Sequence, residues 1–128
     1  EGEDHQNKSK VVKVDSKDSW DFYVTQAATI QGCPIVAHFT AAWCMPSVMM
    51  NPYIEELAST HQNVLFLTVD VDEVKEVAAK YEIKAMPTFL MMKGGGQLVD
   101  KKLVGANPDE IKKWIAGLPH SSPISVVA

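Results

Sequence analysis

The sequence predicts an α/β fold in which a central mixed β-sheet is flanked by helices. Short apolar runs alternate with apolar residues spaced three and four apart, in the order βαβαβαββα, and this order favours a sheet covered on both faces. The run over residues 35–39 is apolar except at His38, as expected for a strand buried on both faces. With 128 residues, 46% of them hydrophobic, the chain can form one domain, which we expect over residues 11–118.

The first part of this domain predicts a strand, a helix and a second strand. Residues 11–14 are the first apolar run, and residues 35–39 are the second strand. Between them, Asp15 or Ser16 can cap a helix that ends at Gly32. The predicted buried face of this helix consists of Trp20, Tyr23, Val24, Ala27 and Ala28.

The middle of the domain predicts two helices separated by a strand over residues 64–69. Pro52 lies inside the first of these helices and should kink its axis, because proline has no amide hydrogen to donate. Asp72 can cap the second helix. The apolar stripe of the first helix is Met50, Tyr53, Ile54, Leu57 and Ala58, and that of the second is Val74, Val77, Ala78 and Tyr81.

The last part of the domain predicts a hairpin and a closing helix. Residues 88–92 and 98–104 are two strands joined by three glycines at 94–96. Asn107 can cap the closing helix, with Pro108 as its first residue. The predicted buried side chains of this helix are Ile111, Trp114, Ile115 and Leu118.

Both ends of the chain are expected to lie outside the domain. Residues 1–10 carry no aliphatic or aromatic side chain, so they have nothing to bury against the entropy of ordering, and we expect a disordered N-terminal tail. Residues 119–128 begin with a segment in which Pro119 and Pro123 break any helix, and we expect a C-terminal tail there. The alternative is that the apolar residues 124–128 dock on the domain.

Composition argues against several classes of function. Twelve basic and sixteen acidic residues give a net charge of −4 without a Lys/Arg cluster, which argues against binding to nucleic acid or to a membrane surface. The apolar runs are far shorter than the ~20 residues that span a bilayer. Two cysteines and four scattered histidines do not give the spacing of a metal site. This use of cysteine fits a reducing compartment, so we expect a cytoplasmic protein.

Residues 39–47, Phe-Thr-Ala-Ala-Trp-Cys-Met-Pro-Ser, carry the chemistry. They place Cys44 between the end of a buried strand and the first turn of a helix. There we expect unpaired amides to point at the sulfur and, with the positive helix end, to favour the nucleophilic thiolate. The Ser47 hydroxyl can turn toward that sulfur as a further donor. The alternative is a plain buried cysteine in a loop.

Residues 43–47, Trp-Cys-Met-Pro-Ser, resemble the Trp-Cys-Gly-Pro-Cys site of thioredoxins with the second cysteine replaced by serine. Residues 86–88, Met-Pro-Thr, resemble the cis-proline segment of that family. Pro52 matches its helix proline, and residues 105–106, Gly-Ala, fall where its substrate groove has a glycine loop. The similarity covers residues 11–118 and points to the plant cytosolic h-type branch. It implies the thioredoxin fold and thiol–disulfide exchange.

The resemblance implies roles for individual residues. Cys44 is then the attacking thiol, Pro87 is a cis residue beside the sulfur, and the Met86 backbone pairs with an extended substrate peptide. The implied substrate-binding residues are Trp43, Met45, Pro46, Met86, Gly105 and Ala106. For Met45 and Met86, ordinary packing in an apolar patch is an equal alternative.

Three positions depart from the family pattern. Ser47 can neither form a disulfide nor expel a bound substrate, so the cycle that uses two cysteines is closed off. His38 stands where the family has a buried aspartate that serves the second cysteine, and Thr68 stands where many members have a lysine. Loss of this buried ionic pair is consistent with loss of the thiol it serves. His38 is then either a neutral core residue with a partner such as the Thr68 hydroxyl, or a proton shuttle for catalysis.

Cys33 is not expected to supply the missing sulfur. About six strand residues at ~3.3 Å each separate it from the end of the strand near Cys44, roughly 20 Å in all, whereas a disulfide needs Cα atoms within ~7 Å. We expect a surface or edge thiol without a catalytic role, the alternatives being dimer formation and glutathionylation through Cys33. Strand-end and capping roles explain Asp70, Asp72 and Glu73 without a metal.

These residues lead to three hypotheses. The first is a monothiol oxidoreductase that performs disulfide exchange, isomerisation or deglutathionylation on disulfide-containing or glutathionylated proteins. It needs no bound cofactor, and glutathione as co-substrate, or glutaredoxin, recycles it in place of thioredoxin reductase. The second is a non-catalytic module that binds peptides or proteins. The third, iron–sulfur binding, is disfavoured because Pro46 and the cis-proline segment crowd the sulfur.

Overall fold

The computed structural model describes residues 10–29, 32–93 and 99–118, which fold around one five-stranded sheet. Its strands lie in the order β1-β3-β2-β4-β5. β1 and β2 pair with β3 in parallel, whereas β4 pairs antiparallel with both β2 and β5, so the predicted mixed sheet is confirmed. The strands are β1 (Val12–Val14), β2 (Ile35–Thr40), β3 (Leu65–Asp70), β4 (Thr88–Met92) and β5 (Val99–Val104).

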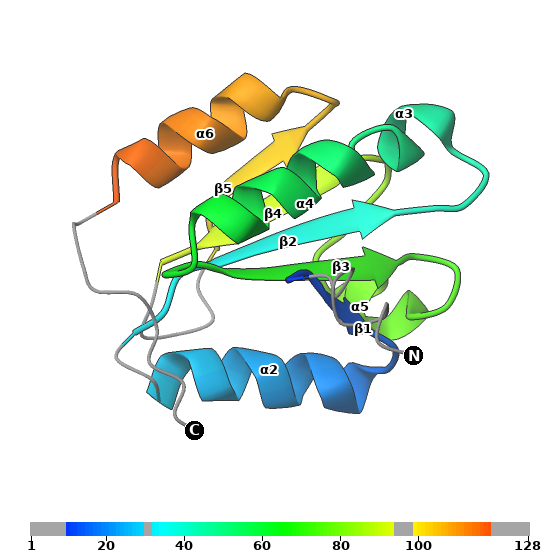
Figure 1. Ribbon diagram of the computed structural model, residues 1–128. Helices are drawn as coiled ribbons and strands as arrows, with labels where there is room; N and C mark the ends of the chain where they lie inside the picture. Colours follow the sequence, from blue (N-terminus) through cyan, green and yellow to red (C-terminus); the bar gives the residue numbers. More distant parts are fainter. Residues whose placement is uncertain (1–9, 30–31, 94–98, 119–128) are drawn as a thin grey trace, which may run out of the picture.

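Helices cover both faces of this sheet (Figure 1). They are α2 (Lys17–Thr29), α3 (Met45–Val48), α4 (Asn51–Thr60), α5 (Lys75–Lys80) and α6 (Pro108–Ala116). One apolar cluster joins α2 and α5 to the sheet, and a second joins α4 and α6 to its other face. No helix in the described ranges is both long enough and apolar enough to cross a membrane.

The central strand β2 contributes alternate residues to the two clusters, because successive side chains of a strand point to opposite faces. Ile35, Ala37 and Phe39 pack in the cluster under α2 and α5. Val36 packs in the cluster under α4 and α6. Every residue of β2 except Thr40 is buried, as predicted from its apolar run. The last residues of this strand therefore give the segment that follows it a rigid base.

The helix expected around Pro52 is divided in two. α3 ends at Val48, a turn follows at residues 49–50, and α4 begins at Asn51. Pro52 is thus the second residue of α4 rather than an interior residue of a kinked helix. In this first turn an amide has no partner within the helix, so proline is tolerated there. The division gives the Cys44 segment a short helix of its own.

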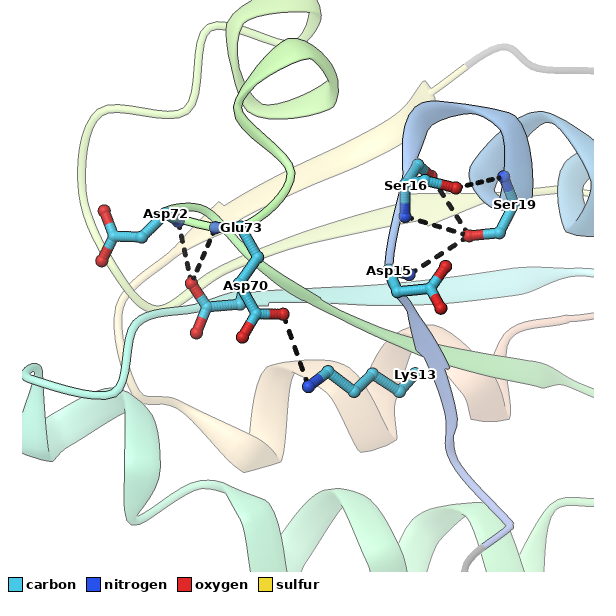
Figure 2. A network of polar contacts seen from close by, with 7 residues as sticks. All are labelled: Lys13, Asp15, Ser16, Ser19, Asp70, Asp72 and Glu73. Atoms are coloured by element: carbon cyan, nitrogen blue, oxygen red, sulfur yellow. Dashed lines mark hydrogen bonds and ion pairs between the residues drawn. The ribbon is translucent and has the colours of Figure 1, made fainter.

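The predicted caps have different outcomes. The Ser16 hydroxyl accepts from the Ser19 amide at 3.0 Å, and Asn107 caps α6 as predicted. Asp72 was expected to cap the next helix, but that expectation is wrong, because α5 starts only at Lys75. The Asp70 carboxylate instead accepts from the amides of Asp72 at 2.8 Å and Glu73 at 3.3 Å (Figure 2).

Two expectations concern segments outside the described residues. The glycine turn at 94–96 falls in the range 94–98, although the strands on either side of it pair as predicted. Residues 1–9 and 119–128, which hold nearly all of the two predicted tails, also lie outside.

Candidate active site

Cys44 lies between β2 and α3, where it is the residue that precedes the first turn of the helix. Its side chain is partly exposed. The thiol contacts the Met86 carbonyl oxygen, 3.4 Å from Sγ, and the Met86–Pro87 peptide bond is cis. The sulfur therefore sits against the start of β4, with Pro87 beside it, as the resemblance implies.

The amides of α3 are not directed at the sulfur in the way we expected. The Ser47 and Val48 amides both donate to the Cys44 carbonyl oxygen at 3.0 Å. These bonds are the normal start of a helix, so the helix takes up these two of the donors that were expected to contact the thiolate. The environment of the sulfur is set instead by partial exposure and by the Met86 carbonyl.

Ser47 is fully buried and its hydroxyl faces the sheet, which corrects the expectation that it turns toward Cys44. It donates to Thr40 Oγ1 and lies 3.4 Å from His38 Nε2. Because the single hydroxyl hydrogen goes to Thr40, the remaining lone pairs of Ser47 can accept from the His38 Nε2–H. Thr40 was missed in the sequence, although it stands two residues after His38 on the same face of β2.

His38 is a buried, neutral residue. Its ring stacks on Phe89, with centroids 4.7 Å apart, and only 1% of the residue is exposed. Burial lowers the pKa of His38 from 6.5 to about 4. Its Nδ1 has no hydrogen-bond partner in the described part of the chain, and its polar neighbour is Ser47 rather than the expected Thr68. The ring is therefore neutral at physiological pH, as in the first of the two expected roles, and the role of proton shuttle stays a prediction.

Trp43 stands on the exposed side of Cys44, with 67% of its surface accessible. Its indole Nε1 donates to the Asp72 carboxylate at 2.8 Å, which anchors the exposed ring of the residue that precedes Cys44. The neighbouring acidic side chains are also occupied, since Asp70 holds its own turn and Glu73 pairs with Lys13 at 3.4 Å (Figure 2). No group of three or more metal-ligating side chains occurs in residues 10–29, 32–93 and 99–118.

An apolar groove of about 420 Å³ opens next to Cys44. It combines residues of α3 and α4 with the loop before α6 and the first residue of that helix. Met45, Pro46 and Ala106 of the predicted substrate surface line it, whereas Trp43 and Met86 are not among its lining residues. Sequence reasoning missed four contributions, those of Met49, Met50, Tyr53 and Pro108. The signal available for Met49 was its spacing of four from Met45. The lining residues are Met45, Pro46, Met49, Met50, Tyr53, Ala106 and Pro108.

Gly105 brings the loop before α6 to the cis-proline segment. Its amide donates to the Pro87 carbonyl at 2.9 Å, and its φ of 117° lies in the region that favours glycine. Ala106 follows directly and lines the groove. The structure therefore brings all the predicted site residues to one end of the sheet, with Ser47 and His38 beneath the surface and the others around Cys44.

Cys33 is buried rather than at a surface or edge, so that expectation is wrong. Only 6% of it is exposed, in the cluster under α2. Its sulfur lies 3.3 Å from the Pro34 carbonyl oxygen and 3.6 Å from that of Asn63, and burial raises its pKa to about 11. Cys33 precedes β2 and Cys44 follows it, so the six residues of that strand separate the two thiols.

The amino-acid sequence of this chain is similar to those of known proteins. Residues 5–117 match the family model described as Thioredoxin. The chain is 60% identical over 120 residues to the thioredoxin-like protein CXXS1 of Arabidopsis thaliana, which covers 94% of this chain and 99% of the relative. It is 54% identical to CXXS1 of Oryza sativa subsp. japonica, with 84% of this chain and 78% of the relative covered.

Solved structures agree with these relatives. The thioredoxin NaTrxh of Nicotiana alata superposes with a TM-score of 0.76 at 35% identity, covering 84% of this chain and 91% of the other. A wild-type poplar thioredoxin h also gives a TM-score of 0.76, at 38% identity, covering 84% of this chain and 94% of the other. The fold and the arrangement of strands around Cys44 are thus shared with proteins of the h type.

Proposed function

Because the chain belongs to the thioredoxin family, whose chemistry is thiol–disulfide exchange, we propose that it is a monothiol oxidoreductase that uses Cys44 alone. Its substrates are disulfide-containing or glutathionylated proteins, and glutathione or glutaredoxin recycles it. The observation that carries this proposal is the placement of Ser47. A buried hydroxyl, bound to Thr40 and next to His38, occupies the position where the family has its second sulfur.

The first half of the reaction is an exchange at Cys44. The Cys44 thiolate attacks one sulfur of the substrate disulfide, a new S–S bond forms, and the other substrate sulfur leaves as a thiolate. The partly exposed sulfur is open to this attack. Within the described residues the Met86 amide makes no hydrogen bond, so it can donate to an extended substrate peptide lying beside the cis-proline segment.

The second half needs a thiol from outside this site. Ser47 offers an alcohol, whose oxygen cannot attack the mixed disulfide to give a second S–S bond, and Cys33 lies buried at the other end of β2. Free glutathione can release the substrate by attacking the mixed disulfide. A second thiol of the substrate can do the same, in which case the net reaction is disulfide isomerisation. Release by glutathione requires a reducing compartment that contains glutathione. We therefore propose that the protein acts in the cytosol.

Mass spectrometry after incubation with glutathione disulfide tests this proposal. We expect a single glutathione adduct on Cys44 that accumulates and that free glutathione removes, because no neighbouring sulfur can expel it. The matched control is Ser47→Cys, which restores a sulfur at the family position. This variant should lose the adduct and form an internal disulfide between positions 44 and 47.

A second assay tests which reductant recycles the protein. An NADPH-coupled assay with thioredoxin reductase should show little insulin reduction by the chain with Ser47 and more by Ser47→Cys. Robust turnover of the chain with Ser47 through that reductase would contradict the monothiol proposal. The exposed apolar groove favours one alternative, a non-catalytic binding module, whose signature is protein binding that survives Cys44→Ser.

A further inference from the structure

Five of the six methionines fall into two groups of very different exposure, and Met86 is intermediate. Met45 is 59% exposed and Met49 is 66% exposed. Met50, at 2%, and Met91 and Met92, both at 0%, are buried in the core. An aqueous oxidant can therefore reach the sulfurs of Met45 and Met49 while the three buried thioethers stay protected.

The two exposed methionines both line the groove beside Cys44. They sit four residues apart, on α3 and in the turn after it, and share the groove with Tyr53 of α4. Pro46 and Ala106 line the same groove; Pro46 is two residues after Cys44, and Ala106 directly follows Gly105. A substrate side chain flanking the disulfide under attack would thus contact these two thioethers first. Among the described residues that line this groove, none is charged.

We propose that Met45 and Met49 form an oxidation-sensitive wall of the substrate groove, and that their conversion to sulfoxide weakens exchange with protein substrates. This inference rests on the proposed function, since it describes how that site is regulated. In the step, hydrogen peroxide transfers one oxygen atom to the thioether sulfur and its O–O bond breaks. The sulfur is oxidised by two electrons, and the peroxide is reduced to water.

Oxidation changes the polarity of the methionine side chain, and this change should weaken the binding of protein substrates. A thioether is apolar and flexible, and it adapts to varied apolar side chains of a partner. A sulfoxide carries a strong hydrogen-bond acceptor, which loses its contacts with water when an apolar substrate side chain covers it. A small disulfide that reacts at Cys44 without filling the groove avoids this penalty. Oxidation should therefore separate protein substrates from small ones.

The test compares two probes before and after oxidation of the full chain. Cys44 is first blocked as a mixed disulfide with thionitrobenzoate, the protein is treated with hydrogen peroxide, and the block is removed with dithiothreitol. Peptide mass mapping then shows which methionines carry oxygen and that Cys44 is intact. The rate of Cys44 exchange is measured with glutathione disulfide and with a glutathionylated peptide that has leucine and phenylalanine beside its cysteine.

We expect sulfoxide at Met45 and Met49 before Met50, Met91 or Met92. We also expect a roughly tenfold slower exchange with the peptide, as for the loss of one buried apolar side chain, and unchanged exchange with glutathione disulfide. Methionine sulfoxide reductase should reverse the effect. In the double variant Met45→Leu/Met49→Leu, which keeps apolar side chains of similar volume, the ratio of oxidised to unoxidised peptide rate should stay near one.

The remaining outcomes are distinguishable. Oxidation of the buried methionines first, or an equal loss with both probes, overturns the inference and leaves the proposed function standing. The same holds if the peptide rate is unchanged after Met45 and Met49 are shown to be oxidised. If the unoxidised protein exchanges with neither probe, the proposed function fails, and the regulatory inference fails with it.

Discussion

The hydrogen-bond partners of Ser47 lie in the sheet, and Cys44 is not one of them in the described residues. Its hydroxyl contacts Thr40 and His38, and these three polar groups form a small buried cluster under the site. A buried hydroxyl without partners costs about 1–3 kcal/mol, so the cluster holds the side chain in this orientation. Cys44 is consequently left with the Met86 carbonyl as its polar contact within the described residues. At this scale the site is one sulfur with no proton-transfer group in contact.

The same cluster makes stability depend on pH through His38. Its pKa of about 4 in the folded protein lies below the ordinary value of 6.5, so the unfolded chain binds a proton that the folded chain excludes. We expect the free energy of unfolding to be highest, for this group, above pH ~6.5 and to fall by at most about 3 kcal/mol between there and about pH 4. Urea unfolding at a series of pH values measures this change.

The control for this prediction is His38→Gln, whose side chain does not titrate. The variant should lose the part of the pH dependence that comes from His38, because the other titrating groups are unchanged. This expectation holds even if the substitution changes the stability at neutral pH. Parallel pH profiles for the two proteins would show that His38 is not the group responsible.

At the level of secondary structure, a short helix and the turn after it position the site. α3 has only four residues and is separated from α4 by a turn at residues 49–50, with Pro52 in the first turn of α4. This division turns Met49 outward, so that it lines the groove, while Met50 enters the core. On the opposite face of the sheet, α2 starts at a reciprocal pair in which Ser16 and Ser19 each accept from the other's amide (Figure 2).

The start of α2 provides a prediction about the caps. Replacing Ser16 by alanine removes the acceptor for the Ser19 amide, and we expect a loss of about 1 kcal/mol of unfolding free energy. Chemical denaturation followed by far-ultraviolet circular dichroism measures the loss. Ser59→Ala, at an exposed position of α4 whose side chain makes no hydrogen bond in the structure, is the matched control and should change little. Equal effects of the two substitutions would argue against the cap.

Periodicity predicted the elements better than it predicted their ends and side-chain partners. The continuous apolar run of β2 and the helical stripe of α6 follow from burial, which the sequence records directly. The Asp72 cap failed because several acidic residues follow β3, and the choice among them depends on where α5 begins. The orientation of Ser47 depends on Thr40 and His38, which local sequence does not single out as its neighbours.

Across the whole molecule, β2 separates two thiols of opposite character. Cys44 lies at its carboxyl end, partly exposed, and Cys33 lies before its amino end, buried in the cluster under α2. Spacing along the strand correctly predicted that they do not pair. Sequence did not predict the burial of Cys33, because that burial arises from the packing of α2 and of the Asn63 segment over this end of the sheet.

This contrast predicts which thiol reacts in the native protein. At about pH 8, iodoacetamide should modify Cys44 and leave Cys33 intact, because burial excludes the reagent and raises the pKa of Cys33 to about 11. Both thiols should react in denaturant, and Cys33 should become reactive along the same denaturation curve as the loss of circular dichroism. Modification of Cys33 in the native protein at the rate of Cys44 would contradict its burial, and peptide mapping distinguishes the two.

The bond between the Trp43 indole and Asp72 has an optical consequence. The three tryptophans lie in three different surroundings: Trp20 is fully buried, Trp114 donates to Asp100 at the partly exposed face of α6, and Trp43, which precedes Cys44 in the chain, stands largely in solvent. A group that attaches to Cys44 changes the solvation of one of these chromophores and leaves the other two as internal standards. The protein thus contains its own fluorescent indicator of when the site is loaded.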